Sequence, residues 1–172
     1  MEILRSGNDL LYTNPDGTIV RICVGENAIF FGKYMYLHNG VKLGNNVKVS
    51  DFASLGKDAI IGQDTHISGN AVIGNRCHIG NDNAISYGSH IGDDVIIGDG
   101  NIISGRCVVS SFTQIGNETK IMGHAYIGKN VKIGDNVTVC HETIIPDDYV
   151  ISDGATAYMT IQKKLAIRYH PP

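Results

Sequence analysis

A six-residue repeat constrains this chain more than any other feature of its sequence. From Phe31 to Thr156 the first position of every unit holds a large apolar residue, and the unit recurs 21 times without an inserted or deleted residue. The fifth position is mostly compact, the second is usually Gly or Ser, and the third and fourth favour Asn, Asp, Gly and Lys. A fixed internal period of this length indicates a stacked repeat architecture.

The period of six restricts the local structure of each unit. It matches neither the 3.6-residue stripe of an amphipathic helix nor the two-residue alternation of a half-buried strand. It does match a short strand followed by a corner. The first and fifth positions then point inward, and Gly, Asn and Asp take the corners, where left-handed backbone angles cost Gly nothing and Asn little.

The number of sides in each coil follows from a longer period. Serine fills the second position of every third unit over four coils, whereas the other units carry mainly Gly there; these serines are Ser50, Ser68, Ser86 and Ser104. The full period is therefore 18 residues, or three sides. Asn83 and Asn101 are also 18 residues apart at inward positions, which predicts an internal amide ladder. Seven coils at a spacing of about 4.8 Å predict a prism roughly 30 Å long.

The two ends of the chain differ from the repeat. Residues 10–13 and 18–21 flank Asn14-Pro15-Asp16-Gly17, which predicts a β-hairpin because Pro presets the turn and Gly accepts a positive φ. A stacked repeat leaves open edges that need covering. We therefore expect an N-terminal hairpin cap over residues 1–30, the repeat over residues 31–156 and a short C-terminal cap over residues 157–172.

Composition excludes several classes of function. The net charge is −3 and the Lys and Arg residues are scattered, so we expect neither nucleic acid nor a membrane as a partner. The sequence contains no apolar run near about 20 residues and no secretory leader pattern, so we expect a cytoplasmic protein. The four cysteines have no zinc or disulfide spacing. Two of them, Cys77 and Cys107, occupy the compact inward position, where we expect them to fill space.

With these features, the unit resembles the hexapeptide-repeat family, whose left-handed parallel β-helix is shared by many trimeric acyltransferases. The resemblance implies an all-β fold, a left-handed parallel β-helix of about seven three-sided coils. The handedness rests on the resemblance alone, because the general rule for parallel crossovers favours the right hand. The family also includes non-catalytic scaffolds, so two classes of function stay open.

Two segments carry a closer resemblance. Residues 121–126, Ile-Met-Gly-His-Ala-Tyr, are similar to the coil of sugar N-acyltransferases and lipid A acyltransferases in which a Gly amide receives the acyl oxygen. This implies that role for Gly123. Residues 145–155 look like the closing segment of the family, with an exposed Ile-Pro turn and a Gly near bound coenzyme A, here Gly154. The resemblance therefore implies acetyl-CoA as cosubstrate and a homotrimer.

The sequence departs from these enzymes at the general base. They place a His followed by an acidic residue one coil before that Gly, where this chain has Gly105-Arg106. A His-acid pair, His141-Glu142, occurs one coil after it instead. His124 and Glu142 share a position in successive coils about 4.8 Å apart, so the carboxylate is expected to orient the imidazole. His124 and His141 both remain candidates for the base.

Further residues complete the predicted site. Lys129 and Lys132, with Lys163, Lys164 and Arg168 in the C-terminal cap, are expected to meet the phosphates of the coenzyme. A metal site is not expected, because His66, His78 and His90 fall on three different sides. The inserted loop of most catalytic relatives has no place here. Two hypotheses result: an acyl-CoA-dependent O- or N-acyltransferase acting on a sugar-like small polar acceptor, or a non-catalytic scaffold.

Overall fold

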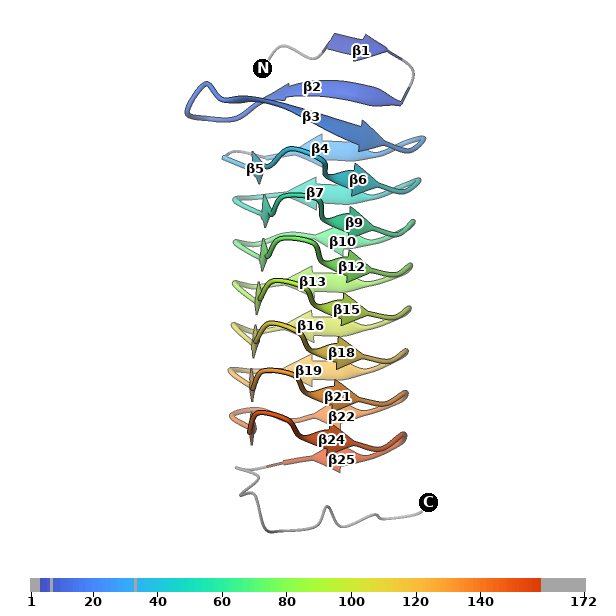
Figure 1. The fold of residues 1–172 in the computed structure, drawn as a ribbon, viewed down its shortest axis with the longest axis vertical. Coiled ribbons are helices and arrows are strands. Elements are labelled where there is room, and N and C mark those ends of the chain that lie inside the picture. The colour runs from blue at the N-terminus through green and yellow to red at the C-terminus, as the bar shows by residue number, and fades with distance from the viewer. Residues whose placement is uncertain (1–3, 7, 33, 159–172) are drawn as a thin grey trace.

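The computed structural model describes residues 4–6, 8–32 and 34–158, which form a three-sided prism of stacked coils (Figure 1). Each side is a β-sheet, and the chain visits the three sheets in turn. Sheet A contains β1 (Leu4–Ser6), β2 (Asp9–Thr13), β3 (Ile19–Val24), β6 (Lys42–Leu43), β9 (Ile60–Ile61), β12 (His78–Ile79), β15 (Ile96–Ile97), β18 (Gln114–Ile115), β21 (Lys132–Ile133) and β24 (Val150–Ile151).

The other two sheets contain only parallel strands. Sheet B contains β4 (Ile29–Phe31), β7 (Lys48–Ser50), β10 (His66–Ile67), β13 (Ala84–Ser86), β16 (Ile102–Ser104), β19 (Lys120–Met122), β22 (Thr138–Val139) and β25 (Thr156–Ala157). Sheet C contains β5 (Tyr36–Leu37), β8 (Ser54–Leu55), β11 (Val72–Ile73), β14 (His90–Ile91), β17 (Val108–Val109), β20 (Tyr126–Ile127) and β23 (Ile144–Ile145). The described residues contain no helix long and apolar enough to cross a membrane.

Strand register confirms the predicted three-sided coil. Ile67 pairs with Ile85 and Ile85 pairs with Ile103, so each coil advances the chain by 18 residues. The internal amide ladder is also present. The Asn101 amide donates to Asn83 Oδ1 at 2.9 Å, and the Thr119 amide donates to Asn101 Oδ1 at 2.8 Å. These bonds satisfy backbone groups that would otherwise be buried without a partner.

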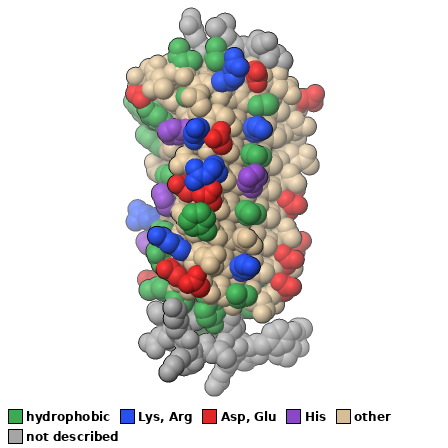
Figure 2. Space-filling view, in the orientation of Figure 1, with side chains coloured by type: hydrophobic (Ala, Val, Ile, Leu, Met, Phe, Trp, Pro, Cys, Tyr) green, Lys and Arg blue, Asp and Glu red, His purple; other side chains and the backbone are tan. Residues whose placement is uncertain are grey.

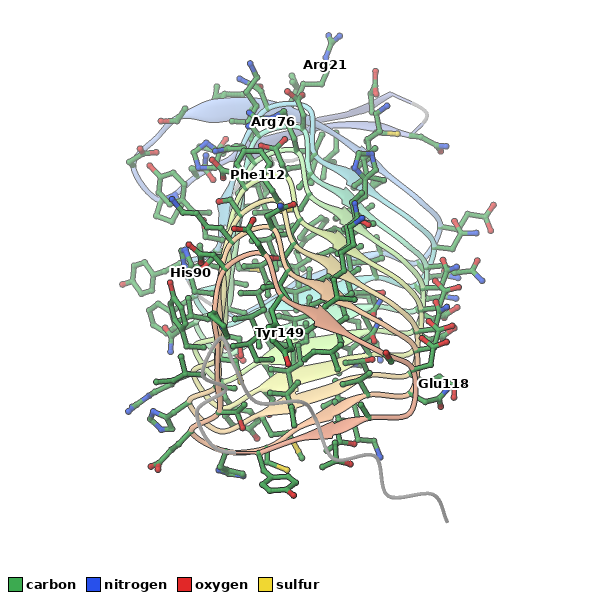
Figure 3. All side chains as sticks on the ribbon, turned by 60° about the horizontal axis from the view of Figure 1, so that its bottom comes forward. Arg21, Arg76, His90, Phe112, Glu118 and Tyr149 are labelled. Carbon is green, nitrogen blue, oxygen red and sulfur yellow. The ribbon has the colours of Figure 1, made fainter. Side chains whose placement is uncertain are left out.

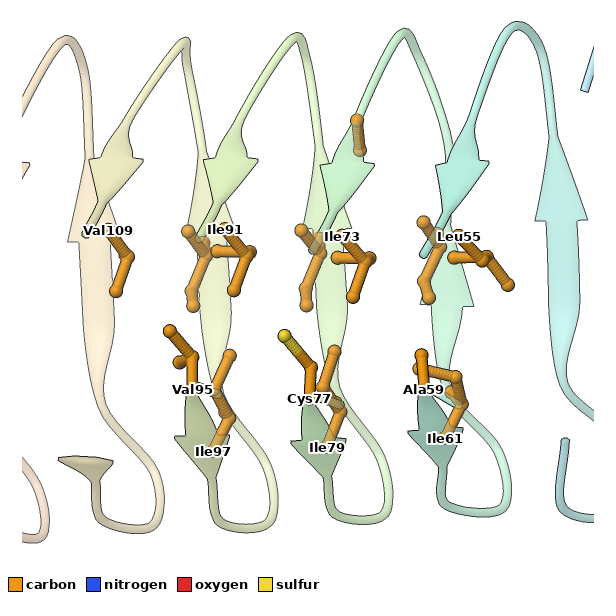
Figure 4. Close-up of a cluster of buried hydrophobic side chains, with 14 of the residues drawn as sticks. Leu55, Ala59, Ile61, Ile73, Cys77, Ile79, Ile91, Val95, Ile97 and Val109 are labelled. Atoms are coloured by element: carbon orange, nitrogen blue, oxygen red, sulfur yellow. The ribbon is translucent and has the colours of Figure 1, made fainter. Parts of the chain in front are cut away.

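The core consists of like residues stacked on like. Every first-position side chain from Leu37 to Ile151 is at most 4% exposed, and the fifth-position side chains line the same interior. Figure 4 shows two such columns, with Ile73 and Ile91 in one and Ile79 and Ile97 in the other. Each buried aliphatic side chain contributes about 1.5–3 kcal/mol, so the columns supply most of the stability.

The first unit differs from the prediction. Phe31 was expected to point inward, but it is 50% exposed, and Phe30 pairs with Val49 instead. The corner between Phe30 and Leu37 therefore holds one extra residue, and the predicted absence of insertions is wrong at this point. The physical reason is that the hairpin strand β3 already belongs to the stack. Val24 pairs with Leu43 and lies six residues before Phe30, which sets the register of that coil.

The N-terminal hairpin is confirmed and covers the first coil. Strands β2 and β3 pair antiparallel, and β1 extends the hairpin by a further strand. The Asn14 side chain takes the place of a strand at the edge of sheet C. Its Nδ2 donates to Leu37 O at 2.8 Å, and the Leu37 amide donates to its Oδ1 at 2.9 Å. The hairpin thus pairs groups that an open edge would leave exposed. Most of the predicted C-terminal cap, residues 159–172, lies outside the described residues.

Candidate functional site

The corners that follow sheets A and C share a structural use of Asn and Asp. We name them the AB corner and the CA corner. In both, a third-position side chain accepts the backbone amide of the coil before: Asp99 Oδ1 accepts from Asn81 at 2.6 Å, and Asp147 Oδ1 accepts from Lys129 at 2.7 Å. Acidic side chains gather along the right-hand edge of the prism, where the AB corner lies (Figure 2). Many of these acids therefore hold successive coils together.

The third corner, from sheet B to sheet C, is built differently. We name it the BC corner, with third and fourth positions Asp51-Phe52, Gly69-Asn70, Tyr87-Gly88, Gly105-Arg106, Gly123-His124 and His141-Glu142. In the first five pairs both residues have positive φ, so the backbone itself makes the turn. Among the described residues, no side chain of this corner accepts an amide from the coil before it. From Asn70 to Glu142, the side chains of this corner therefore take no such part in joining the described coils.

Gly123 and His141 fit together closely. Gly123 is buried and has a φ of 58°. A Cβ at this position would overlap His141 Nδ1 and the rest of its ring, so the imidazole occupies the space that a side chain at 123 would fill. Glycine is therefore required here both by the backbone and by the histidine. His124 follows on the same corner and is exposed.

The amide of Gly123 has a partner within the chain. It donates to the carbonyl oxygen of Ser104 in the preceding coil at 3.0 Å. To receive an acyl oxygen, as the sequence predicts, this amide would have to leave Ser104.

His124 and Glu142 lie in successive coils, as predicted. The His124 amide donates to Gly105 O at 2.7 Å, and the Glu142 amide donates to Gly123 O at 2.8 Å. Their side chains do not form an ion pair. The ion pairs of the described residues are Lys57–Asp58 at 4.0 Å and Arg76–Asp94 at 2.6 Å. The stacking brings the two residues to one corner, but the carboxylate does not hold the imidazole in this structure.

The predicted coenzyme residues lie elsewhere in the chain. Lys129 is on the CA corner, Lys132 is in β21 of sheet A and Gly154 is on the AB corner. Lys163 and Lys164 lie outside the described residues. Within one chain, the first three do not meet the histidines of the BC corner. In the closing segment Ile145 is fully buried, as its first position in the repeat predicts, and Asp147 and Asp148 of the turn that follows are exposed.

The other histidines and the inward cysteines are dispersed. His66, His78 and His90 lie in sheets B, A and C, and the described residues contain no group of three or more ligands placed to hold a metal. His90 and Glu118 project from different sides of the prism (Figure 3). Burial raises the pKa of the Cys77 thiol to about 11, and its Sγ donates to Gly92 O at 3.0 Å. It therefore stays protonated and fills the core.

A groove beside the BC corner was not predicted from the sequence. It has a volume of about 390 Å³ on the outer face of sheet B, and its lining residues are Asp51, His66, Ser68, Gly69, Ala84, Ser86 and Tyr87. The available signal was the pair of small residues Gly69 and Ala84 among bulkier neighbours. A second groove of about 630 Å³ follows the AB corner and is lined by Asp82, Asp99, Gly100, Asn117, Glu118, Asp135 and Asn136. Several of these residues belong to the Asn/Asp ladder.

Comparison with protein families now identifies the fold. The model of the EIF2B subunit epsilon LbH domain matches residues 32–139. The chain belongs to this left-handed β-helix family. The match confirms the resemblance to left-handed hexapeptide-repeat proteins and provides the handedness that the periodicity leaves open. Comparison with curated proteins gives no match.

Several solved structures share this left-handed β-helix. LpxA from Acinetobacter baumannii superposes with a TM-score of 0.66 at 20% identity, covering 83% of this chain and 65% of that one. UDP-N-acetylglucosamine O-acyltransferase (LpxA) from Moraxella catarrhalis has a TM-score of 0.53 at 25% identity, with coverage of 72% and 58%. LpxA from Bacteroides fragilis has a TM-score of 0.62 at 20% identity, with coverage of 80% and 63%. The chain spans less than two thirds of the length of each.

Proposed function

We propose that this β-helix is an acyltransferase that moves an acyl group, in the simplest case acetyl from acetyl-CoA, to the hydroxyl or amine of a small sugar-like acceptor. The observation that carries the proposal is the BC corner between residues 105 and 142. It gathers Arg106, His124, His141 and Glu142 in three consecutive coils, and the stacking of the coils uses none of their side chains. The similar Moraxella catarrhalis protein is a UDP-N-acetylglucosamine O-acyltransferase, which supports the same class of reaction.

The chemistry needs one base and one defined path for the proton. An imidazole of the BC corner takes the proton from the acceptor hydroxyl or amine as its oxygen or nitrogen attacks the thioester carbonyl carbon. The carbon–sulfur bond then breaks, and the thiolate takes the proton from the imidazolium. Both side chains are exposed, and His141 is the better fixed candidate because its ring lies against Gly123. Under this proposal Glu142, which follows His141 directly, stabilises the imidazolium.

The coenzyme site requires more than one chain under this proposal. Lys129, Lys132 and Gly154 lie on other sides of the prism from the histidines, so a single chain does not bring them together. In a homotrimer with its axis parallel to the coils, a lysine-bearing side of one chain faces the BC corner of the next. The acetyl-CoA phosphates would then meet Lys129 and Lys132, together with Lys163 and Lys164 of the C-terminal segment.

A non-catalytic scaffold is the second candidate, and specific observations favour it. Gly105-Arg106 stands where the resemblance expects a His-acid pair, and the Gly123 amide is bonded to Ser104 O. The matching family model also describes a domain of a larger subunit. A scaffold would use the flat outer faces of the prism and would bind no thioester.

Two measurements separate these functions. Under the transferase proposal, acetyl-CoA at a hundredfold excess over its Kd raises the melting temperature by about 5 °C or more. The double variant His124→Ala/His141→Ala then loses transfer to a panel of amino and hydroxyl sugars, while the control His78→Ala on sheet A keeps it. An unchanged melting temperature, or full activity of the double variant, would leave the scaffold as the function. Light scattering that reports a monomer would contradict the trimeric coenzyme site.

A further inference from the structure

The groove on sheet B beside the BC corner has features of a ligand site separate from the histidines. Its position is set by a change in side-chain size down the sheet. Ala84 lies in register between His66 above and Ile102 below, so the outer surface drops at one coil and rises again at the next. Gly69 deepens the same place. Its φ is +61°, and a Cβ there would lie 3.1 Å from the Tyr87 amide.

Tyr87 forms one wall of the groove in an unfavourable backbone conformation. Its φ is 53° and its side chain is 73% exposed, the highest value among the large apolar and aromatic side chains of the described residues. The left-handed region suits Gly, which takes the same position in three neighbouring coils, at Gly69, Gly105 and Gly123. A bulky residue held there without burial gains nothing for the core. Positive φ is shared by many corner residues of this prism, so the exposure of this bulky ring beside the groove, and not its backbone angle, marks Tyr87 as a candidate for function.

The lining residues define the chemistry of the ligand. Asp51 offers a carboxylate acceptor, His66 offers a ring nitrogen as donor or acceptor, and Ser68 and Ser86 offer hydroxyls. Tyr87 adds an exposed aromatic face. None of the described lining residues is Lys or Arg, which disfavours a phosphate or carboxylate ligand, and the polar lining disfavours a lipid. A neutral ring that carries hydroxyls at its edge and C–H groups on its face matches this set.

A second observation extends the aromatic surface along the corner. Tyr34 and Phe52 stack with ring centroids 5.4 Å apart and an interplanar angle of 20°. Both side chains are more than half exposed. Phe52 follows Asp51 directly, so the pair continues from the upper rim of the groove. Aromatic rings held rigidly at the surface give contact area at a low cost in conformational entropy.

We propose that this groove binds a neutral saccharide, with one sugar ring stacked on Tyr87 and its hydroxyls bonded to Asp51, His66 and the two serines. The volume of about 390 Å³ is in the range of small-molecule sites. Two coils separate Tyr87 from His124 and three separate it from His141, or about 10 and 14 Å along the prism, so a single ring in the groove does not reach the histidines. The site is therefore additional to the proposed transferase centre and does not depend on it.

The test is isothermal titration calorimetry of the full chain with three neutral trisaccharides: cellotriose, maltotriose and triacetylchitotriose. At least one is expected to bind with a Kd of about 1 mM or tighter. Tyr87→Gly is expected to weaken that binding about tenfold, and Asp51→Asn at least about threefold, from the loss of stacking and of a charge-assisted hydrogen bond. Tyr87→Gly also relieves the backbone, so its melting temperature does not fall and unfolding cannot explain the loss.

Two controls make the result specific. Phe112 is 58% exposed with a φ of 64°, but it lies on the CA corner, so Phe112→Gly should keep the parent affinity. The double variant His124→Ala/His141→Ala should also keep it, whatever becomes of acyl transfer. The proposal is overturned if none of the three trisaccharides binds at about 20 mM, a concentration well above the expected Kd. It is equally overturned if Tyr87→Gly binds as the parent does, or if the histidine variant loses the saccharide.

Discussion

The AB corner and the BC corner make the same turn in the same 18-residue register with different means. At the AB corner a side chain stitches one coil to the next, as Asp99 does for the Asn81 amide. At the BC corner two consecutive left-handed residues make the turn, as at Gly105 and Arg106, and the side chains are left outside. The third-position acids of the first corner are therefore structural, whereas the aromatic, basic and histidine residues on the second have no comparable hydrogen bond.

This difference teaches how to interpret polar residues on a repeat. A column of Asp, Asn and Glu resembles a cation site when the sequence alone is considered. At the AB corner, the hydrogen bonds show that third-position members cap backbone amides instead. The residues that depart from the repeat, such as Tyr87 and His141, are the ones that the fold does not need.

The largest expected effect comes from the core that both corners share. Ile97 is 2% exposed and packs between Ile79 and Ile115 in sheet A. Ile97→Asp places a charge there without a polar partner, so we expect the free energy of unfolding to fall by more than about 4 kcal/mol. The variant should then show no cooperative unfolding transition, because it is already unfolded at room temperature. Thermal and urea denaturation measure this. A variant that melts within a degree or two of the parent would refute the inward assignment.

The next effect separates the two corners directly. Asp99→Ala removes the acceptor of the Asn81 amide and should lower the free energy of unfolding by about 1–2 kcal/mol. The matched change at the third position of the BC corner, Tyr87→Ala, removes no such bond among the described residues and should stay within about 0.5 kcal/mol of the parent. Urea denaturation of both variants provides the values. Equal losses at the two positions would remove the distinction between the corners.

Backbone conformation provides a smaller test of opposite sign. Tyr87→Gly should raise the free energy of unfolding by about 0.5–1 kcal/mol, because Gly adopts the left-handed region without strain. Gly105→Ala should lower it by a similar amount or more, because its φ is 88° and a Cβ would lie 2.9 Å from the Gly123 amide. Thermal melts of the two variants should move in opposite directions. Movement in the same direction would contradict the assigned turn geometry.

The smallest effect concerns a surface ion pair on the CA corner. Hydrogen bonds from Arg76, at 2.6–2.7 Å, lower the pKa of Asp94 below its usual 3.8. A lowered folded-state pKa stabilises the fold above the unfolded value and is lost as pH falls through the folded one. The melting-temperature difference between the parent and Asp94→Asn should therefore be constant from pH 7 to about 5 and shrink below pH 3.8. A difference that grows toward low pH would contradict this.

Much of the fold follows from the sequence because the period alone fixes it. Positions such as Leu55 and Ile97 recur at six residues, and Ser68 and Ser86 reveal the 18-residue coil. The extra residue after Phe30 was not predicted, because Phe30 and Phe31 are equally apolar. Hydrophobicity alone therefore does not determine which of them points inward. The hairpin strand decides the choice through a pairing distant in sequence.

For the candidate site, the sequence predicts which residues share a corner but not how their side chains make contact. Spacing places His124 and Glu142 in adjacent coils, but it does not determine where the exposed side chains point or that the Gly123 amide bonds to Ser104 O. The packing of His141 over Gly123 also depends on the turn geometry. The groove beside Tyr87 arises from small residues in two strands, which a one-dimensional pattern does not relate.

The most direct test of the central claim is chemical-shift mapping of the isotope-labelled protein with acetyl-CoA. We place catalysis at the BC corner, coenzyme binding near Lys129 and Lys132, and a structural role at the AB corner around Asp99. The largest amide shifts are expected on residues 105–106, 123–124 and 141–142 and near Lys129 and Lys132, with the AB corner around Asp99 unchanged. Shifts concentrated on the AB corner, or no shifts at saturating acetyl-CoA, would contradict this assignment.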